Sequence, residues 1–218
     1  MKNCIITISR EYGSGGRDVG RMLAEQLGLP VFDKEIMHLA IEKSGLPGDF
    51  IEKHCEKVPS KFIQALKRLS LNVPSTRMPS GYTSHVAAIP LNKKTDADNV
   101  FQTQSAVIKE IAESGSCVII GRLAGYVLRE HPNLFSVFIR GDFEDRVKRT
   151  IEVYNLPAEN AAKDVKKIDK HRANHYKLFT DQKWGDAKNY DLVINTSSVG
   201  IAGAVNVIKS MLSERIKE

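Results

Sequence analysis

The sequence has few cysteines and no long apolar run. Its 218 residues include three cysteines, and none of them forms a C-x-x-C pair. Cys4 and Cys117 lie in apolar, strand-like runs, so we expect buried free thiols in a reducing compartment. No apolar run approaches the roughly 18 residues that a membrane-spanning helix needs. The first residues also lack the apolar region of a signal peptide, and we therefore expect a soluble, cytoplasmic protein.

Aromatic residues are also scarce, and neither sign of charge dominates. Hydrophobic residues make up 42% and charged residues 27%, which excludes collagen-like, coiled-coil and wholly disordered chains. The 32 Lys and Arg exceed the 26 Asp and Glu, and the net charge of +6 favours an anionic partner. A phosphate-bearing small molecule meets this preference as well as nucleic acid does. Because the 7% of aromatic residues form no stacking stripe, nucleic-acid binding ranks last.

Short apolar runs alternate with helical patterns along most of the chain. The runs lie at 5–8, 30–33, 117–120, 134–139 and 192–195. Helical patterns begin near residue 18, span about 101–114 and 158–177, follow Asp142 as an N-cap, and end the chain. Five apolar strands separated by helices predict an α/β fold with a parallel sheet covered on both faces.

The chain is predicted to form a single domain, residues 1–218, that carries an insertion. The core segments are 1–45, 101–157 and 178–218. Residues from 46 to about 100 hold five of the eight prolines and little regular pattern. Long irregular segments of this kind are often lids or binding loops, and a disordered excursion is the alternative.

A glycine-rich loop joins the first strand to the first helix. It reads Ser9-Arg10-Glu11-Tyr12-Gly13-Ser14-Gly15-Gly16-Arg17-Asp18. Backbone N–H groups of such a loop and of a helix N-terminus bind phosphates. The standard pattern G-x-x-x-x-G-K-[ST] is not met, because Gly16 occupies the lysine position and no Ser or Thr follows. On pattern alone, a tight strand-to-helix turn without a ligand stays open.

Residues 8–17, Ile-Ser-Arg-Glu-Tyr-Gly-Ser-Gly-Gly-Arg, resemble the start of the cytidylate kinase-like family. The resemblance continues at 23–28, 32–35, 117–122, 138–149, 169–172 and 190–196. It implies a three-layer P-loop kinase fold with a five-stranded parallel sheet, an acceptor-binding insertion at about 46–100 and a helical lid at about 158–177. It also implies ATP and Mg²⁺ as cofactors, and a nucleoside monophosphate or a similar small phosphate acceptor as substrate.

The resemblance assigns the donor phosphates to the glycine loop. The phosphate-binding residues that it implies are Gly13, Ser14, Gly15, Gly16, Arg17 and Asp18. Arg17 is the nearest cation that could replace the missing lysine. The alternative is that its side chain simply lies on the exposed face of the first helix. Asp18 replaces the Mg²⁺-binding hydroxyl, where it could ligate the metal or merely favour the helix N-terminus. Asp33 could hold a Mg²⁺-bound water or cap a following helix.

The resemblance places the acceptor near other basic residues. Arg122 matches the arginine of a Gly-Arg motif that holds the monophosphate, and Asp169 and Arg172 match an Asp-x-x-Arg pair that reads cytosine. The implied acceptor-binding residues are Asp33, Arg122, Lys166, Asp169 and Arg172. The implied catalytic residues are Arg17, Arg122, Lys170 and Arg172. For the basic stretch at 158–177, a solvated helix face is the alternative.

Two functions are therefore compared. The first is an ATP-dependent, Mg²⁺-assisted phosphotransferase, in which catalysis consists mainly of positioning and charge neutralisation. The second is a nucleotide-binding module with little or no catalysis, which the missing lysine and hydroxyl suggest. The aspartates that flank Gly-Arg in true cytidylate kinases are Ile120 and Leu123 here, so the resemblance does not imply CMP as the acceptor.

Overall fold

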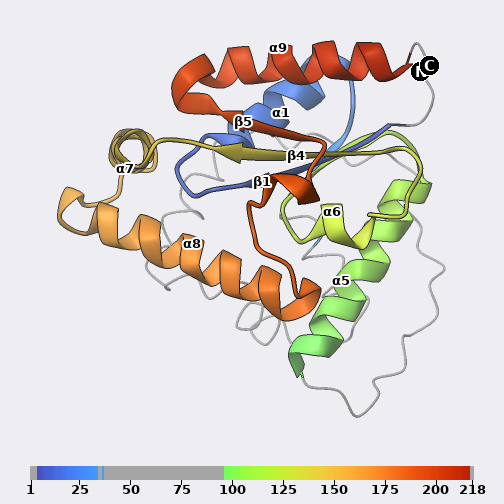
Figure 1. The fold of residues 1–218 in the computed structure, drawn as a ribbon, viewed down its shortest axis with the longest axis horizontal. Helices are drawn as coiled ribbons and strands as arrows, with labels where there is room; N and C mark the ends of the chain where they lie inside the picture. The colour runs from blue at the N-terminus through green and yellow to red at the C-terminus, as the bar shows by residue number, and fades with distance from the viewer. Residues whose placement is uncertain (1–3, 34–35, 37–95, 217–218) are drawn as a thin grey trace. The chain divides into compact units, whose positions relative to one another are not determined.

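A computed structural model describes residues 4–33, 36 and 96–216 of the chain (Figure 1). The predicted insertion lies outside the described residues, apart from its last few positions. The chain forms two compact units, one of Met1–Asp33 with Ile108–Glu218 and one of Lys34–Val107. The glycine loop and the other predicted site residues all belong to the first unit, which is described below.

Five parallel strands form one sheet in the order β2-β3-β1-β4-β5. They are β1 Ile5–Arg10, β2 Val31–Phe32, β3 Cys117–Ile120, β4 Leu134–Arg140 and β5 Leu192–Asn195. In the three central strands, the β-branched and aromatic residues are buried on both faces, as in parallel sheets covered by helices. The predicted α/β fold with a five-stranded parallel sheet is confirmed. In such sheets ligands bind at the carboxyl edge, where the strand order reverses next to β1.

Helices connect the strands. They are α1 Gly16–Leu27, α5 Asp96–Glu113, α6 Ala124–Val127, α7 Phe143–Glu152, α8 Ala158–Thr180, α9 Thr196–Ile216 and the 3₁₀ helix η1 Ala187–Asn189. α1 begins two residues before the predicted start, and α8 continues one turn beyond the predicted end. α6 and η1 were not predicted, because elements of three or four residues are too short to show a hydrophobic period. Asp142 precedes α7 as predicted, but its side chain accepts from Asn195 and makes no capping bond.

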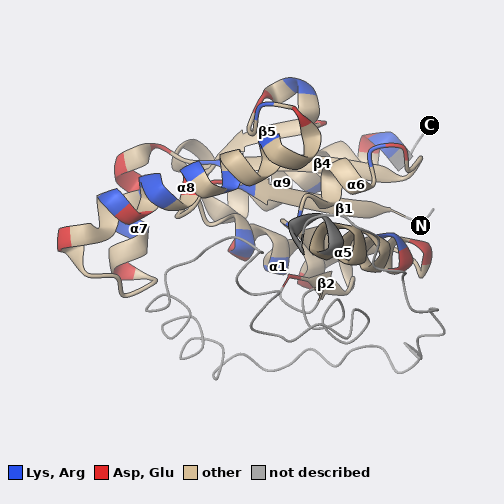
Figure 2. Ribbon diagram, turned by 90° about the horizontal axis from the view of Figure 1, so that it is seen from below, with Lys and Arg blue, Asp and Glu red and all other residues tan. Residues whose placement is uncertain are grey.

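One face of the sheet is covered by α1 and α9 (Figure 1). The core on this face combines Ile6 and Ile8 of β1 with Leu23 of α1 and Ile208 of α9, all fully buried. α6 lies against the other face, where it contacts β1 and β4. Basic residues recur along α8 (Figure 2). The loops at the carboxyl edge follow directly from the ends of these packed strands.

Candidate active site

The glycine loop lies at the carboxyl end of the central strand β1. Gly13 and Gly15 have left-handed φ angles of 79° and 75°. A Cβ on Gly13 would lie 2.5 Å from the backbone oxygen of Arg146, and one on Gly15 would lie 3.1 Å from Ile201 Cδ1. Both positions therefore require glycine for conformation and for space. The first N–H groups of α1 have no acceptor within the helix, so the loop and this terminus form a potential anion site.

Asp33, at the end of β2, forms a buried ion pair with Arg17 of α1. Arg17 Nε lies 2.6 Å from Asp33 Oδ2, and Asp33 is 5% exposed. Burial opposes ionisation of this carboxyl, but the charges of Arg17, Arg10 and Arg122 outweigh it and lower the pKa of Asp33. One carboxylate is therefore surrounded by several arginines, and the carboxyl edge carries an excess of positive charge.

Arg122 follows β3 in an unusual backbone conformation. Gly121, Arg122 and Leu123 have consecutive left-handed φ angles of 75°, 59° and 53°. For a residue other than glycine this conformation costs about 1–2 kcal/mol, and such strain concentrates at functional sites. The turn leaves the Arg122 charge close enough to Asp33 to lower its pKa.

Arg146 of α7 joins the glycine loop to α8 and to the turn that precedes α7. Its Nε donates to the oxygen of Gly141 at 3.0 Å and lies 3.4 Å from Glu11 Oε2. Its Nη1 donates to the oxygen of Tyr12 at 3.1 Å and to a carboxylate oxygen of Asp169. Arg146 was not among the predicted site residues, although it lies in the segment 138–149 that resembles the family. The sequence feature that could have pointed to Arg146 is a basic residue on the helix that follows a predicted strand.

α8 contacts the loop through the predicted Asp-x-x-Arg pair. Asp169 Oδ1 accepts from the N–H of Tyr12 at 2.7 Å, and Arg172 Nη1 donates to the oxygen of Arg10 at 3.0 Å. A spacing of three residues puts both side chains on one side of the helix. In this structure both side chains contact the loop backbone, and cytosine reading by them stays a prediction.

The predicted lysines of α8 lie elsewhere. Lys166 Nζ is 4.8 Å from the centre of the Phe143 ring, a cation–π contact with α7. Lys170 is exposed to solvent. The structure therefore brings Asp169 and Arg172 to the loop, whereas Lys166 packs on α7 and Lys170 faces water.

The two predicted metal ligands have different surroundings. Asp33 is engaged by Arg17, whereas Asp18 is half-buried in the first turn of α1. Among the described residues, no three His, Cys, Asp or Glu side chains are grouped to hold a metal ion. Mg²⁺ commonly uses one or two carboxylates together with waters and substrate phosphates. Asp18 fits this kind of site better than Asp33 does.

A cavity of about 290 Å³ lies beside the loop. Its lining residues are Gly13, Asp145, Arg146, Lys148, Arg149, Glu152, Val153, Thr196 and Ser197. The hydroxyl of Thr196, at the start of α9, donates to the oxygen of Ser14 at 2.7 Å. The cavity is therefore formed by the loop, α7 and the β5–α9 junction. Arg149 and Thr196 were not predicted as site residues, because only the order of the strands brings them next to the loop.

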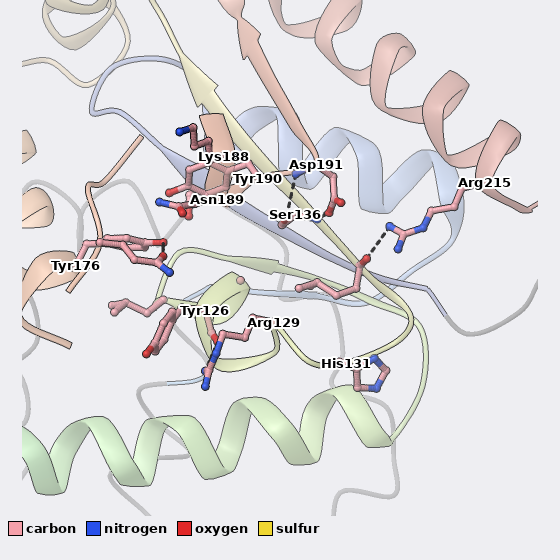
Figure 3. A pocket seen from close by; sticks show the side chains of 15 residues that line it. Tyr126, Arg129, His131, Ser136, Tyr176, Lys188, Asn189, Tyr190, Asp191 and Arg215 are labelled. Atoms are coloured by element: carbon pink, nitrogen blue, oxygen red, sulfur yellow. Dashed lines mark hydrogen bonds between the residues drawn. The ribbon is translucent and has the colours of Figure 1, made fainter. Parts of the chain in front are cut away.

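A larger cavity, of about 370 Å³, opens among α6, β4, η1 and the ends of α8 and α9 (Figure 3). None of the predicted site residues lines it. Its charged groups hold the fold together: Arg215 donates to the oxygen of Leu134 at 2.6 Å, and Asp191 accepts from the N–H and hydroxyl of Ser136. We therefore take the glycine loop, where the backbone donors and the arginines converge, as the candidate active site.

Comparisons with known proteins agree with this geometry. A cytidylate kinase from Pseudothermotoga lettingae is 23% identical over 100% of this chain and 97% of its own. A structure of an uncharacterized protein from Eubacterium ventriosum has a TM-score of 0.67 at 26% identity and covers 98% of this chain and 99% of its own. Shikimate kinase from Acinetobacter baumannii shares the P-loop kinase fold, with a TM-score of 0.50, 16% identity and coverage of 98% and 95%.

In the described part of the chain, no helix is long and apolar enough to cross a membrane. The model of the cytidylate kinase-like family matches residues 5–198. With the glycine loop, the Gly-Arg turn and the Asp-x-x-Arg pair all at the carboxyl edge of one sheet, the chain belongs to the cytidylate kinase-like family.

Proposed function

We propose that this protein is an ATP-dependent phosphotransferase that acts on a nucleoside monophosphate or a similar small phosphate acceptor. The observation that carries the proposal is the excess of arginines over carboxylates at the glycine loop. Arg10, Arg17 and Arg122 act together on the single buried carboxylate of Asp33. Phosphoryl transfer needs little covalent help from a protein and depends on positioning and on neutralising charge.

Separate parts of the site suit the donor and the acceptor. The loop residues 13–16 and the start of α1 would hold the donor phosphates, and the 290 Å³ cavity would take the nucleoside of ATP. Arg122 would hold the acceptor phosphate from the strained turn after β3. Arg172, already directed at the loop backbone, would stabilise the transferred group. We further propose that Asp18 contributes a carboxylate to Mg²⁺, which offsets charge on the phosphates, and that the protein is cytoplasmic.

The proposal is tested by measuring ADP release from ATP and Mg²⁺ with CMP, dCMP, UMP, AMP or GMP added singly. We expect one monophosphate to stimulate release and Arg122→Met to abolish the stimulation. Arg129→Met is the matched control, because Arg129 is a half-exposed arginine paired with Glu130 beyond α6. Stimulation that survives Arg122→Met would contradict the role given to this arginine.

Arg17 needs a different design because of its partner. Arg17→Ala alone leaves Asp33 buried without its ion pair, so lost activity could reflect lost stability. The double variant Arg17→Ala with Asp33→Ala removes both charges. If Arg17 contacts the donor phosphates, the double variant keeps its thermal stability better than the single variant but stays inactive.

The alternative function is a nucleotide-binding module with little or no catalysis. It is favoured by Gly16 at the lysine position, where a side chain has no room. ATP binding by calorimetry without ADP release, for every acceptor tested, would support this alternative and refute the phosphotransferase.

A further inference from the structure

The phosphate loop departs from the standard pattern at three positions, and two of the three changes are reciprocal. When Gly15 is aligned with the second glycine of G-x-x-x-x-G-K, the first glycine falls on Arg10 and the lysine on Gly16. The chain thus has an arginine where glycine is standard, and a glycine where the cation is standard.

The two positions are in contact in the fold. A Cβ on Gly16 would lie 2.5 Å from Arg10 Cβ and 3.0 Å from Arg10 Cγ, with Ile139 Cβ behind at 3.2 Å. Gly16 has no left-handed φ, so its backbone does not demand glycine. Space alone excludes a side chain there, and the stem of Arg10 occupies that space.

A second glycine accommodates the other end of the Arg10 side chain. A Cβ on Gly121 would overlap the Arg10 guanidinium, whose Cζ would be 2.9 Å away. The N–H of Gly121 donates to the oxygen of Ile8 at 2.9 Å, which holds the end of β3 beside the end of β1. Arg10 therefore extends from β1 over Gly16 to the Gly-Arg turn, where its charge also helps to lower the pKa of Asp33.

We propose that Arg10 supplies the phosphate-binding cation that Gly16 lacks, by contacting the β- and γ-phosphates of ATP across the loop. The inference rests on the proposed function for its choice of ligand. Arg17, the candidate nearest in sequence, has its Nε committed to Asp33 at 2.6 Å. A guanidinium can also bind a phosphate with two parallel hydrogen bonds, which a lysine cannot do.

The test compares the binding of ATP, ADP and AMP, each with Mg²⁺, to the full chain by isothermal calorimetry. Arg10→Met is expected to weaken ATP and ADP binding by roughly 10- to 100-fold, the range for hydrogen bonds to charged groups. AMP lacks the contacted phosphates and should change less than about twofold. Arg129→Met is the control and should change none of the three. Arg10→Lys keeps the charge with a shorter reach and should fall between wild type and Arg10→Met.

Exchanging both residues provides a stricter test. Gly16→Lys alone should lower the melting temperature, because its stem meets Arg10. Arg10→Gly alone should lose ATP affinity. The double variant Arg10→Gly with Gly16→Lys restores the standard glycine and the standard lysine, and it should recover both properties. If the double variant binds ATP no better than Arg10→Gly alone, the proposed exchange of roles between Arg10 and the standard lysine is overturned. Unchanged ATP affinity in Arg10→Met would overturn it as well.

The outcomes separate this inference from the proposed function. If wild type binds ATP and releases no ADP with any acceptor, but Arg10→Met still lowers ATP affinity, the phosphotransferase fails and the role of Arg10 stands. If wild type is active and Arg10→Met retains both ATP affinity and turnover, the role of Arg10 fails alone. If wild type binds neither ATP nor ADP, both are refuted.

Discussion

Arg146→Ala offers the most direct test of how the glycine loop is held. The guanidinium of Arg146 lies between the carboxylates of Glu11 and Asp169 and donates to the backbone oxygens of Tyr12 and Gly141. Its side chain is 10% exposed, whereas those of Glu11 and Asp169 are 25% and 17% exposed. Its removal leaves both carboxylates without this cation, although each still accepts from a backbone N–H, and two carbonyl oxygens lose a donor.

The size of the effect follows from this burial. Breaking a buried ion pair costs about 3–5 kcal/mol. Because Glu11 and Asp169 retain some contact with water, we expect the lower end of that range, near 3 kcal/mol. For a chain of this length each kcal/mol lowers the melting temperature by about 2–4 °C, so the expected fall is about 6–12 °C.

The assay is thermal unfolding monitored by circular dichroism, together with ATP binding. Arg140→Ala is the control, since Arg140 is half-exposed and its nearest Asp142 oxygen is 3.9 Å away; it should cost about 0–1 kcal/mol. Arg146→Lys keeps one charge but fewer donors and should be intermediate. A fall below about 2 °C in Arg146→Ala would refute the reasoning, because the buried contacts would then contribute less than 1 kcal/mol.

Three further predictions concern single positions. Asp33→Asn should destabilise the protein at neutral pH. Because the native pKa of Asp33 is lowered, its stabilisation starts to fall near the ordinary value of 3.8 and is lost as pH drops through the lower native pKa, so the difference in melting temperature from wild type should shrink over that range. Burial and the neighbouring Cys4 raise the pKa of Cys117 to about 12, so iodoacetamide should label Cys117 only after denaturation, as mapped by mass spectrometry; rapid labelling of the native protein would contradict its burial. Gly13→Ala puts a Cβ 2.5 Å from an α7 carbonyl and should weaken ATP binding and stability together. Gly28→Ala has a similar φ of 65° with nothing within 4 Å and should cost only about 1–2 kcal/mol; an equal loss in both variants would show that conformation alone matters.

The strands and the longer helices could be predicted because their signals are local. Ile5-Ile6-Thr7-Ile8 and Cys117-Val118-Ile119-Ile120 form strands, as their apolar, β-branched composition favours. α1 is bounded by glycines in left-handed conformations at positions 15 and 28, which the sequence also marks. α6 has only four residues and directly follows the strained turn at 121–123, so no periodic sequence pattern predicts it.

Partners within the site could not be predicted, because they come from distant parts of the chain. The sequence places Asp169 and Arg172 on a helix, but it does not identify their hydrogen-bond partners. Asp169 accepts from the N–H of Tyr12, and Arg172 donates to the oxygen of Arg10, each some 160 positions away. Arg146 looks like any basic residue of an amphipathic helix until the strand order brings α7 beside the loop.

The sequence by itself determined that this chain has an α/β fold, that a glycine loop follows its first strand, and that basic residues outnumber acidic ones. These properties depend on composition and on spacings of a few residues. The tertiary structure decided which charges meet: Arg17 with Asp33, Arg146 with Asp169, and the stem of Arg10 with the empty side of Gly16. The physical reason is that parallel strands bring residues remote in sequence to one edge of the sheet, where burial makes each pairing strong enough to matter.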